Sequence, residues 1–300
     1  MSEVDPRLPL ELEKIIFTYA LQNRIKDLPS LFLVARRISQ WLAREAFKVV
    51  ILSESYSSGF RVTLPRFKRY GKHIQSLLID YNLRPTTITG TTSPACLQDI
   101  YTLINECISC CPNLIRLGVW HRSSIAQMGS IMAKSLPLTH LTLSPHHLYN
   151  HFNILFPSTS NCSLLTIPLP LFQNITHLDL LGTPFTYANR ETQAVALSVQ
   201  FPSVTHLSLG IVDSLDTTAL KLLFKSFIHL RILVLWLAGS HLSLIADRKL
   251  PPGMDDDDRI VNLVCNRRND WEAGARGSKD TWALAEQVVA KRAQVATQST

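Results

Sequence analysis

The sequence of this 300-residue chain is short of charge, glycine and long hydrophobic runs. Charged residues make up only 18% of it and hydrophobic residues 46%, which excludes a disordered chain, because disordered chains lack the apolar surface that offsets the entropy lost on ordering. The most apolar run, from Ile232 to Ala238, has seven residues, against the roughly 20 that a membrane-spanning helix needs. We therefore expect a globular protein that does not enter a membrane.

The sequence also lacks a secretory signal and a regular cysteine framework. Its first residues, MSEVDPRLPLEL, contain acids and prolines where a signal peptide needs a basic start followed by an apolar stretch. The six cysteines have no regular spacing. We therefore expect reduced thiols and a location in the cytoplasm or the nucleus.

Motifs for enzyme chemistry are missing as well. The chain contains no G-x-x-x-x-G-K, G-x-G-x-x-G, G-x-S-x-G or H-E-x-x-H pattern. Cys107 to Cys111 include a C-x-x-C, but no second ligand pair follows at zinc-finger spacing, which favours cysteines packed at a repeat junction. His147 and His151 lack a third ligand nearby in sequence. We expect no enzyme, no cofactor and no bound metal, while a hydrolase or metalloenzyme based on the histidines and this cysteine group remains an alternative.

The net charge of +7 is spread thinly along the chain, and its densest basic patch is one short segment. Its five cations are Arg61, Arg66, Lys68, Arg69 and Lys72, with no acid among them. Such a patch suits phosphates, but no nucleic-acid recognition motif accompanies it. We interpret residues 53–72 as a solvated basic connector and expect no nucleic-acid partner.

The most informative feature is an internal repeat, apolar-x-x-apolar-x-apolar, along the middle of the chain. Three copies share the tripeptide Thr-His-Leu, which begins at Thr139, Thr176 and Thr205. The copies are Ile74-x-x-Leu77-x-Ile79, Leu114-x-x-Leu117-x-Val119, Leu138-x-x-Leu141-x-Leu143, Ile175-x-x-Leu178-x-Leu180, Val204-x-x-Leu207-x-Leu209 and Leu230-x-x-Leu233-x-Leu235.

Amphipathic segments precede several of these copies, and three of them reach a proline just before the next copy. The expected helices cover Leu97 to Ser109, Ser124 to Ser135, Arg190 to Gln200 and Thr218 to Ser226. Helix and short strand in alternation predict an α/β fold in which parallel strands are joined by helical crossovers. Because the repetition is local, the predicted architecture is a curved solenoid over residues 73–246.

Alternation along each short strand predicts two faces. Leu141, Leu178 and Leu207 should point inward and stack, whereas the histidine before each of them should point outward, onto the concave surface. We expect these rings to contact a partner rather than to hold a metal. The candidate target-binding surface consists of Arg116, Trp120, His140, His177, Asp179, His206 and Trp236.

The repeated segments resemble the leucine-rich-repeat family, in particular the long, irregular repeats of F-box proteins. Before them, the first fifty residues predict a small all-α domain, 1–52, that ends near the strand-like Val49 to Leu52. Its first helix, Leu8 to Leu21, has two apolar stripes, one with Leu12, Ile15, Ile16 and Tyr19 and the other with Leu10, Phe17 and Leu21. So small a bundle can scarcely cover both, so one stripe should meet a partner. Asp27 caps an expected second helix running to Arg37, and Ile38 to Phe47 form a third.

This domain resembles an F-box, through Leu8-Pro9-Leu10-Glu11-Leu12, the Ile16-Phe17 pair and Leu33-Val34-Ala35-Arg36-Arg37. The resemblance implies docking onto the Skp-type adaptor of a cullin ubiquitin ligase. The adaptor-facing positions that it implies are Leu8, Pro9, Leu12, Ile16, Phe17 and Val34. A helical bundle that only caps the solenoid remains the alternative.

The tail, residues 247–300, begins with an acidic loop, Asp255 to Asp258. Arg259 to Cys265 then predict a closing strand, and a helix that carries Trp282 and Ala285 predicts a C-terminal cap, similar to the acidic-Trp endings of fungal F-box-like repeat proteins. The leading hypothesis is the substrate-recognition subunit of a Skp–cullin–F-box-type ubiquitin ligase that binds a target protein through the repeats. The alternative is a scaffold with the same repeats and no ligase.

Overall fold

The computed structural model describes residues 8–23, 36–53, 59–80, 102, 104–120, 136–144, 172–182, 190–210, 217–236, 257–264 and 266–298. Several predicted features lie outside these residues. They are most of the second N-terminal helix with Val34, the helix over 124–135, His147, His151, and Cys96, Cys162 and Cys265.

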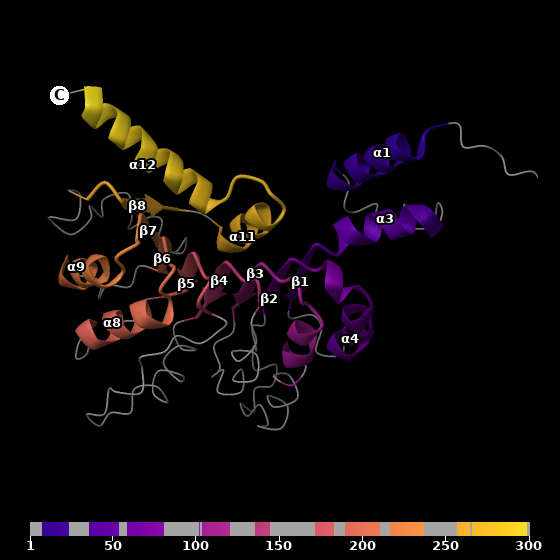
Figure 1. The fold of residues 1–300 in the computed structure, drawn as a ribbon, viewed down its shortest axis with the longest axis horizontal. Helices are drawn as coiled ribbons and strands as arrows, with labels where there is room; N and C mark the ends of the chain where they lie inside the picture. The colour runs from indigo at the N-terminus through magenta and orange to yellow at the C-terminus, as the bar shows by residue number, and fades with distance from the viewer. Residues whose placement is uncertain are drawn as a thin grey trace, which may run out of the picture.

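A single parallel sheet organises the chain (Figure 1). Its eight strands follow one another in sequence order, so each pairs with the strand before it and the strand after it. They are β1 (Val49–Ser53), β2 (Ser76–Asp80), β3 (Arg116–Val119), β4 (His140–Leu143), β5 (His177–Leu180), β6 (His206–Gly210), β7 (Ile232–Trp236) and β8 (Ile260–Leu263). An all-parallel sheet with helices in an α/β arrangement is confirmed, and its strand order is compatible with a solenoid.

The register of the strands places the repeated leucines in one line. Leu141 lies opposite Leu178, and Leu178 lies opposite Leu207. The same position holds Leu77 and Leu117 on one side and Leu233 on the other. These side chains are buried in one continuous apolar core. The predicted stacking of the central leucines is therefore confirmed.

Helices cover the leucine face of the sheet. α8 (Arg190–Gln200) and α9 (Thr217–Ser226) match the predicted crossovers, and residues 104–109 are helical as well. Cys107 and Cys111 are buried at a repeat junction, as expected, and burial raises the pKa of each thiol to about 12. They are therefore inert packing groups.

The sheet extends beyond the repeat array expected from the sequence. β1 was assigned to the N-terminal helical domain, yet Val50 pairs with Leu77 and packs against the same core. β8 lies in the expected tail, where the sequence predicted a closing strand. β1 has the repeat spacing, with Phe47, Val50 and Leu52 packed in the same core, whereas β8 continues the ladder with Ile260 in the core and without the complete motif.

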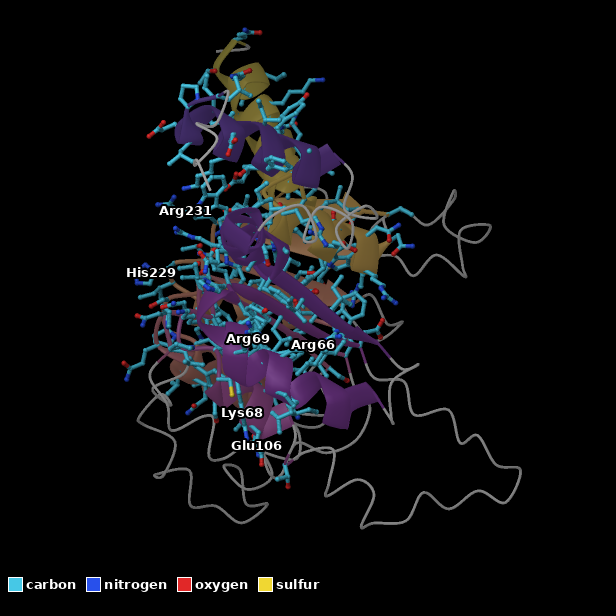
Figure 2. The ribbon with its side chains drawn as sticks, turned by 90° about the vertical axis from the view of Figure 1, so that its right-hand side faces the viewer. Arg66, Lys68, Arg69, Glu106, His229 and Arg231 are labelled. Atoms are coloured by element: carbon cyan, nitrogen blue, oxygen red, sulfur yellow. The ribbon has the colours of Figure 1, made fainter. Side chains whose placement is uncertain are left out.

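The basic segment differs from the solvated connector that the sequence predicted. It forms α4 (Gly59–Tyr70), followed by the short 3-10 helix η3 (Gly71–His73), so it is the crossover between β1 and β2. Phe67 is buried in the core, while Arg66, Lys68 and Arg69 are exposed (Figure 2). The charges misled the prediction, because the apolar residues between them are spaced to face the sheet.

Two helices precede the sheet. α1 (Leu10–Asn23) lies against α3 (Arg36–Ala46), and Phe17 packs against Ile38 and Leu42. They correspond to the first and third helices expected from the sequence. A complete F-box bundle is not established by the residues described.

The C-terminal helices cover the other face of the sheet, opposite the leucines (Figure 1). In α11 (Arg267–Ala275), Trp271 and Ala275 pack against Val49 and Leu78. α12 (Thr281–Gln298) packs over β7 and β8 through Ala285. The tail thus covers a face rather than only the end of the array, and both faces are covered, as in most parallel sheets.

α12 also contacts the outer edge of the last strand. Nη1 of Arg292 donates hydrogen bonds to the carbonyl oxygens of Asp258, at 3.2 Å, and Ile260, at 2.7 Å.

Among the residues described, no helix is both long and apolar enough to cross a bilayer.

Candidate functional site

The face opposite the leucines carries two rows of polar residues across the central strands. The first row runs through Arg116, His140, His177 and His206, which are paired in register from β3 to β6. The second row lies two residues further along the strands and contains Thr142, Asp179 and Ser208. Both rows alternate with the buried leucines, as the strand geometry requires.

The three histidines form a stacked ladder. The ring centroids of His140 and His177 are 4.1 Å apart, and those of His177 and His206 are 4.3 Å apart, with interplanar angles of 10° and 11°. A hydrogen bond of 2.8 to 2.9 Å links Nδ1 of each ring to the hydroxyl of the threonine before it. This ladder explains the repeated Thr-His-Leu tripeptide, in which threonine orients the ring, histidine stacks and leucine enters the core.

The ladder is uncharged at neutral pH. Burial, reinforced by Arg116 and the neighbouring rings, lowers the pKa of His140 to about 3 and that of His177 to about 2. Burial also lowers the pKa of His206, although the nearby Glu286 acts in the opposite direction. Three closely stacked imidazolium ions would repel one another, so neutral rings are what the stack requires.

The first turns of α12 lie directly on this ladder. The ring of Trp282 meets His177 and His206 edge-on, with centroid distances of 5.3 and 5.8 Å. Oε1 of Glu286 lies 3.3 Å from Nε2 of His206. The helix therefore touches the ladder through one aromatic ring and one carboxylate.

An ion pair fixes the start of the same helix. Nη1 of Arg116 lies 3.2 Å from Oδ2 of Asp280, and both side chains are largely buried, at 13% and 11% exposed. Oδ1 of Asp280 accepts a hydrogen bond from the backbone N–H of Ala283, so this residue also caps α12. Gly274 in α11 lies against this ion pair. Any side chain at that position would collide with both Arg116 and Asp280, so the close packing requires glycine.

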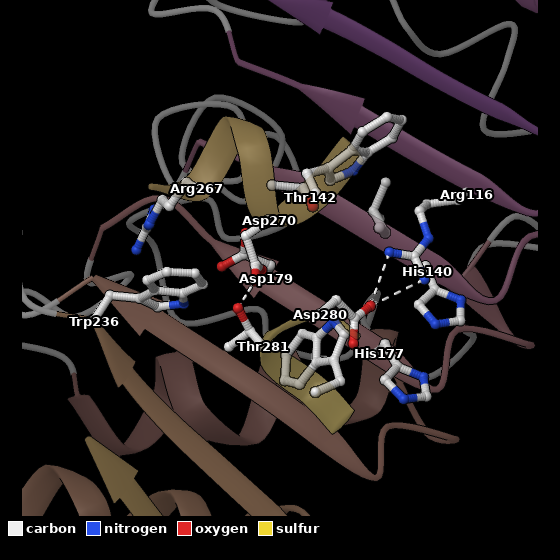
Figure 3. Close-up of a pocket in the computed structure, with 13 residues that line it drawn as sticks. Arg116, His140, Thr142, His177, Asp179, Trp236, Arg267, Asp270, Asp280 and Thr281 are labelled. Carbon is white, nitrogen blue, oxygen red and sulfur yellow. Dashed lines mark hydrogen bonds and ion pairs between the residues drawn. The ribbon is translucent and has the colours of Figure 1, made fainter. Parts of the chain in front are cut away.

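A second cluster surrounds Asp179 (Figure 3). The hydroxyl of Ser208 donates a 2.7 Å hydrogen bond to Oδ1 of Asp179 and accepts one from the indole N–H of Trp236. The guanidinium of Arg267 lies 4.7 Å from the Trp236 ring centroid. Burial raises the pKa of Asp179, while the positive charge of Arg267 and the hydrogen bonds from Ser208 and Thr142 oppose that rise.

The site also depends on the absence of a side chain at Gly118 in β3. A Cβ there would lie 2.6 Å from Cδ1 of Leu78 and 3.1 Å from Nε1 of Trp271, both too close. Trp271 can approach the strand only because this position is glycine. A glycine inside a strand is typical of such close approach.

The predicted target-binding residues do share one face, but that face is not open as expected. Asp179, His206 and Trp236 are 9%, 7% and 5% exposed beneath the C-terminal helices. Trp120 packs in the cluster around Trp271. Strand register predicts which residues share a face, but it does not predict whether another segment covers that face, and their role in target binding stays a prediction.

A pocket remains between the sheet and the two helices, with room for about one water molecule. Its lining includes Arg116, His140, Asp179 and Asp280 (Figure 3). Within the described residues, no three His, Cys, Asp or Glu side chains are placed to hold a metal ion. Ser208 is fully buried, so its hydroxyl is out of reach of a substrate. This arrangement suits specific packing between segments.

The predicted adaptor-facing residues lie on α1 and just before it. Leu8, Leu12 and Ile16 are 43%, 47% and 52% exposed, and Pro9 is exposed as well. Phe17 instead packs against α3. All four residues of the stripe with Leu12, Ile15, Ile16 and Tyr19 are exposed, whereas in the other stripe Leu10 is exposed and Phe17 is packed.

The sequence interpretation missed the sheet contacts of Arg267, Asp280 and Glu286. These residues come from the tail, which was expected only to cap the array. Two signals pointed toward them: the acid and tryptophan pairs Asp270-Trp271 and Asp280-Thr281-Trp282, and the glycine inside β3.

No family model matches this chain, and no curated protein matches it.

Proposed function

We propose that this protein is the substrate-recognition subunit of a Skp–cullin–F-box-type ubiquitin ligase. In this proposal α1 docks onto the Skp-type adaptor, and the repeat sheet with its C-terminal helices presents the surface for a target protein. Ubiquitin transfer is carried out by recruited enzymes, so the chain itself performs no chemistry. The supporting observation is the set of exposed apolar residues on α1.

Exposure of this kind is unusual for a helix that stays in water. Ile15 and Tyr19 are 62% and 68% exposed, next to the half-exposed Leu12 and Ile16. Contiguous apolar patches on soluble proteins mark interaction sites, because water disfavours them. Burying each such side chain contributes about 1.5–3 kcal/mol to association. The spacing i, i+3, i+4, i+7 is that of a helix which inserts one face into a groove of its partner.

The decisive experiment is coprecipitation of the full chain with a purified Skp-type adaptor. Leu12→Asp combined with Ile16→Asp should weaken binding at least about a hundredfold, because two apolar anchors become charged. Ile228→Asp is the matched control, since Ile228 is 81% exposed and lies between α9 and β7, away from α1. Equal binding by the double variant and the control would refute the proposal.

A non-ligase scaffold is the second candidate, and the position of the N-terminal helices favours it. α3 ends at Ala46, just before β1, so α1 and α3 stand at the first strand of the array, where a cap is needed. A cap predicts no adaptor binding at any concentration. It also predicts that Phe17→Ala, which removes packing against α3, alters stability and nothing else.

A further inference from the structure

The covered polar face has the composition of a binding site for a helix. The sheet contributes the cation Arg116, the stacked rings of His140, His177 and His206, and the indole of Trp236. Asp179 is the sole acid among the residues named here, and it is buried beneath its hydrogen bonds. The face therefore offers positive charge and aromatic edges to whatever lies on it.

The segment that lies on it has the complementary chemistry. Asp280 pairs with Arg116, Trp282 meets two of the rings, and Glu286 meets His206. These groups sit within the first two turns of one helix. The signature is carboxylate-x-Trp followed by a second carboxylate one turn later.

Only the first half of this helix packs on the sheet, where Ala285 and the partly buried Trp282, Val288 and Val289 join an apolar cluster with residues of β7 and β8. Within α12 only Thr281 and Ala285 are buried, and the residues from Ala290 to Gln298 are exposed. The side chain of Glu286, which lies beside the neutral ring of His206, is 58% exposed. An interface confined to about two turns of one helix, with a few polar anchors beside a small apolar cluster, is much smaller than the interfaces of permanent complexes, so a competing helix can displace α12.

We infer that the polar face of β3 to β7 is a helix-binding surface for target proteins, that its ligand is a helix with the carboxylate-x-Trp and second-carboxylate signature, and that α12 is the competing occupant supplied by the chain itself. This inference rests on the proposed role of the sheet in target recognition and specifies the chemistry of the target. A target must displace α12 to bind, so its apparent affinity is reduced by the fraction of molecules in which the face is covered.

The test uses the full chain and a fluorescein-labelled synthetic peptide of residues 279–298. One variant, called the loosened chain, carries Asp280→Asn and Glu286→Gln. These changes remove both carboxylates without changing side-chain size, and asparagine at position 280 can still cap α12. The matched control carries Asp258→Asn and Glu272→Gln, which remove the same charge from exposed or half-exposed side chains that do not touch the ladder. A second peptide, with Asp280→Ala and Trp282→Ala, controls for non-specific binding.

Fluorescence anisotropy should show the native peptide binding the loosened chain at least roughly tenfold more tightly than it binds the wild type or the control chain, since the Arg116–Asp280 ion pair and the carboxylate beside His206 have been removed from α12. Adding Arg116→Ala to the loosened chain should abolish this gain. Equal affinity for all chains, or equal affinity of both peptides, would overturn the inference. If the double variant does not fold, Glu286→Gln alone, which changes a half-exposed residue, must show a smaller gain in the same direction.

Adaptor binding separates the two proposals. The loosened chain has an unchanged α1, so it should bind the Skp-type adaptor as the wild type does. Peptide binding without adaptor binding would keep the helix-binding surface and remove the ligase role. Adaptor binding without peptide binding would keep the ligase role and remove the helix-binding surface.

Discussion

The two terminal helices of the described chain present opposite chemistry to their surroundings. α1 directs large apolar side chains such as Ile15 and Tyr19 into water, whereas α12 places carboxylates against a buried sheet face. The hydrophobic effect alone would favour the reverse arrangement. α1 packs on α3 through Phe17 and leaves other apolar side chains exposed, whereas α12 is positioned by polar pairs as well as by an apolar cluster. The comparison teaches that hydrophobicity alone does not decide which face of a terminal helix is covered, although the core of the sheet is apolar throughout.

The ion pair at the start of α12 should break this comparison most strongly. Arg116→Ala leaves Asp280 largely buried without its cation, which should lower the free energy of unfolding by about 3 kcal/mol, because a buried charge loses its partner. Urea denaturation measures this change. Arg116→Ala combined with Asp280→Ala should recover part of the loss, and a double variant as unstable as the sum of both single variants would show that the pair does not interact.

Acid should weaken the histidine ladder next. The pKa of His177 is lowered from 6.5 to about 2. Below about pH 6.5 the ring of His177 is therefore protonated in the unfolded chain but stays neutral in the folded chain. The contribution of the neutral ring to the free energy of unfolding is therefore complete above about pH 6.5, and it is lost as the pH falls from there toward 2. Each such histidine should cost about 2 kcal/mol between pH 6.5 and 5.

The difference between wild type and His177→Phe isolates this effect. Phenylalanine keeps an aromatic ring in the stack but does not titrate, so its unfolding curves should depend less on pH. Asp179 and Asp270, whose pKa burial raises, are present in both chains and shift stability in the opposite direction. An identical pH dependence of both chains would contradict a neutral ladder.

The smallest effect is expected on α1. Leu12→Ala should change the free energy of unfolding by no more than about 0.5 kcal/mol, since the side chain is already 47% exposed. Thermal unfolding of the isolated chain measures it. A loss as large as that of Arg116→Ala would mean that the chain itself covers this residue, and the contrast between the two helices would disappear.

The sheet could be predicted from sequence because its information is local. The spacing around Leu141, Leu178 and Leu207 fixes strand, face and order, and the shared Thr-His-Leu tripeptide aligns the copies. The prediction missed that β1 belongs to the array, although Phe47, Val50 and Leu52 have the same apolar-x-x-apolar-x-apolar spacing as the later copies. The helical crossover α4 was missed because its charges concealed the spacing of Leu64 and Phe67.

The sequence predicted the sheet residues of the site but not the residues of the C-terminal helices that contact them, because those contacts join distant parts of the chain. Arg116 and Asp280 are 164 residues apart in the chain, and no local pattern links an arginine in a strand to the cap of a distant helix. The same holds for His206 and Glu286. Gly118 was the available signal for these contacts, because a glycine inside a strand indicates that another segment approaches the strand closely at that position.

The guanidinium of Arg292 has a consequence for how molecules meet one another. Within the described part of the chain, β1 and β8 each pair with one neighbouring strand, so β8 of one molecule could pair with β1 of the next, and that contact would repeat without closing. By occupying the carbonyl oxygens of Asp258 and Ile260, Arg292 turns one end of the array into a poor template. A single cation on a helix that otherwise points into solvent thereby works against fibre growth.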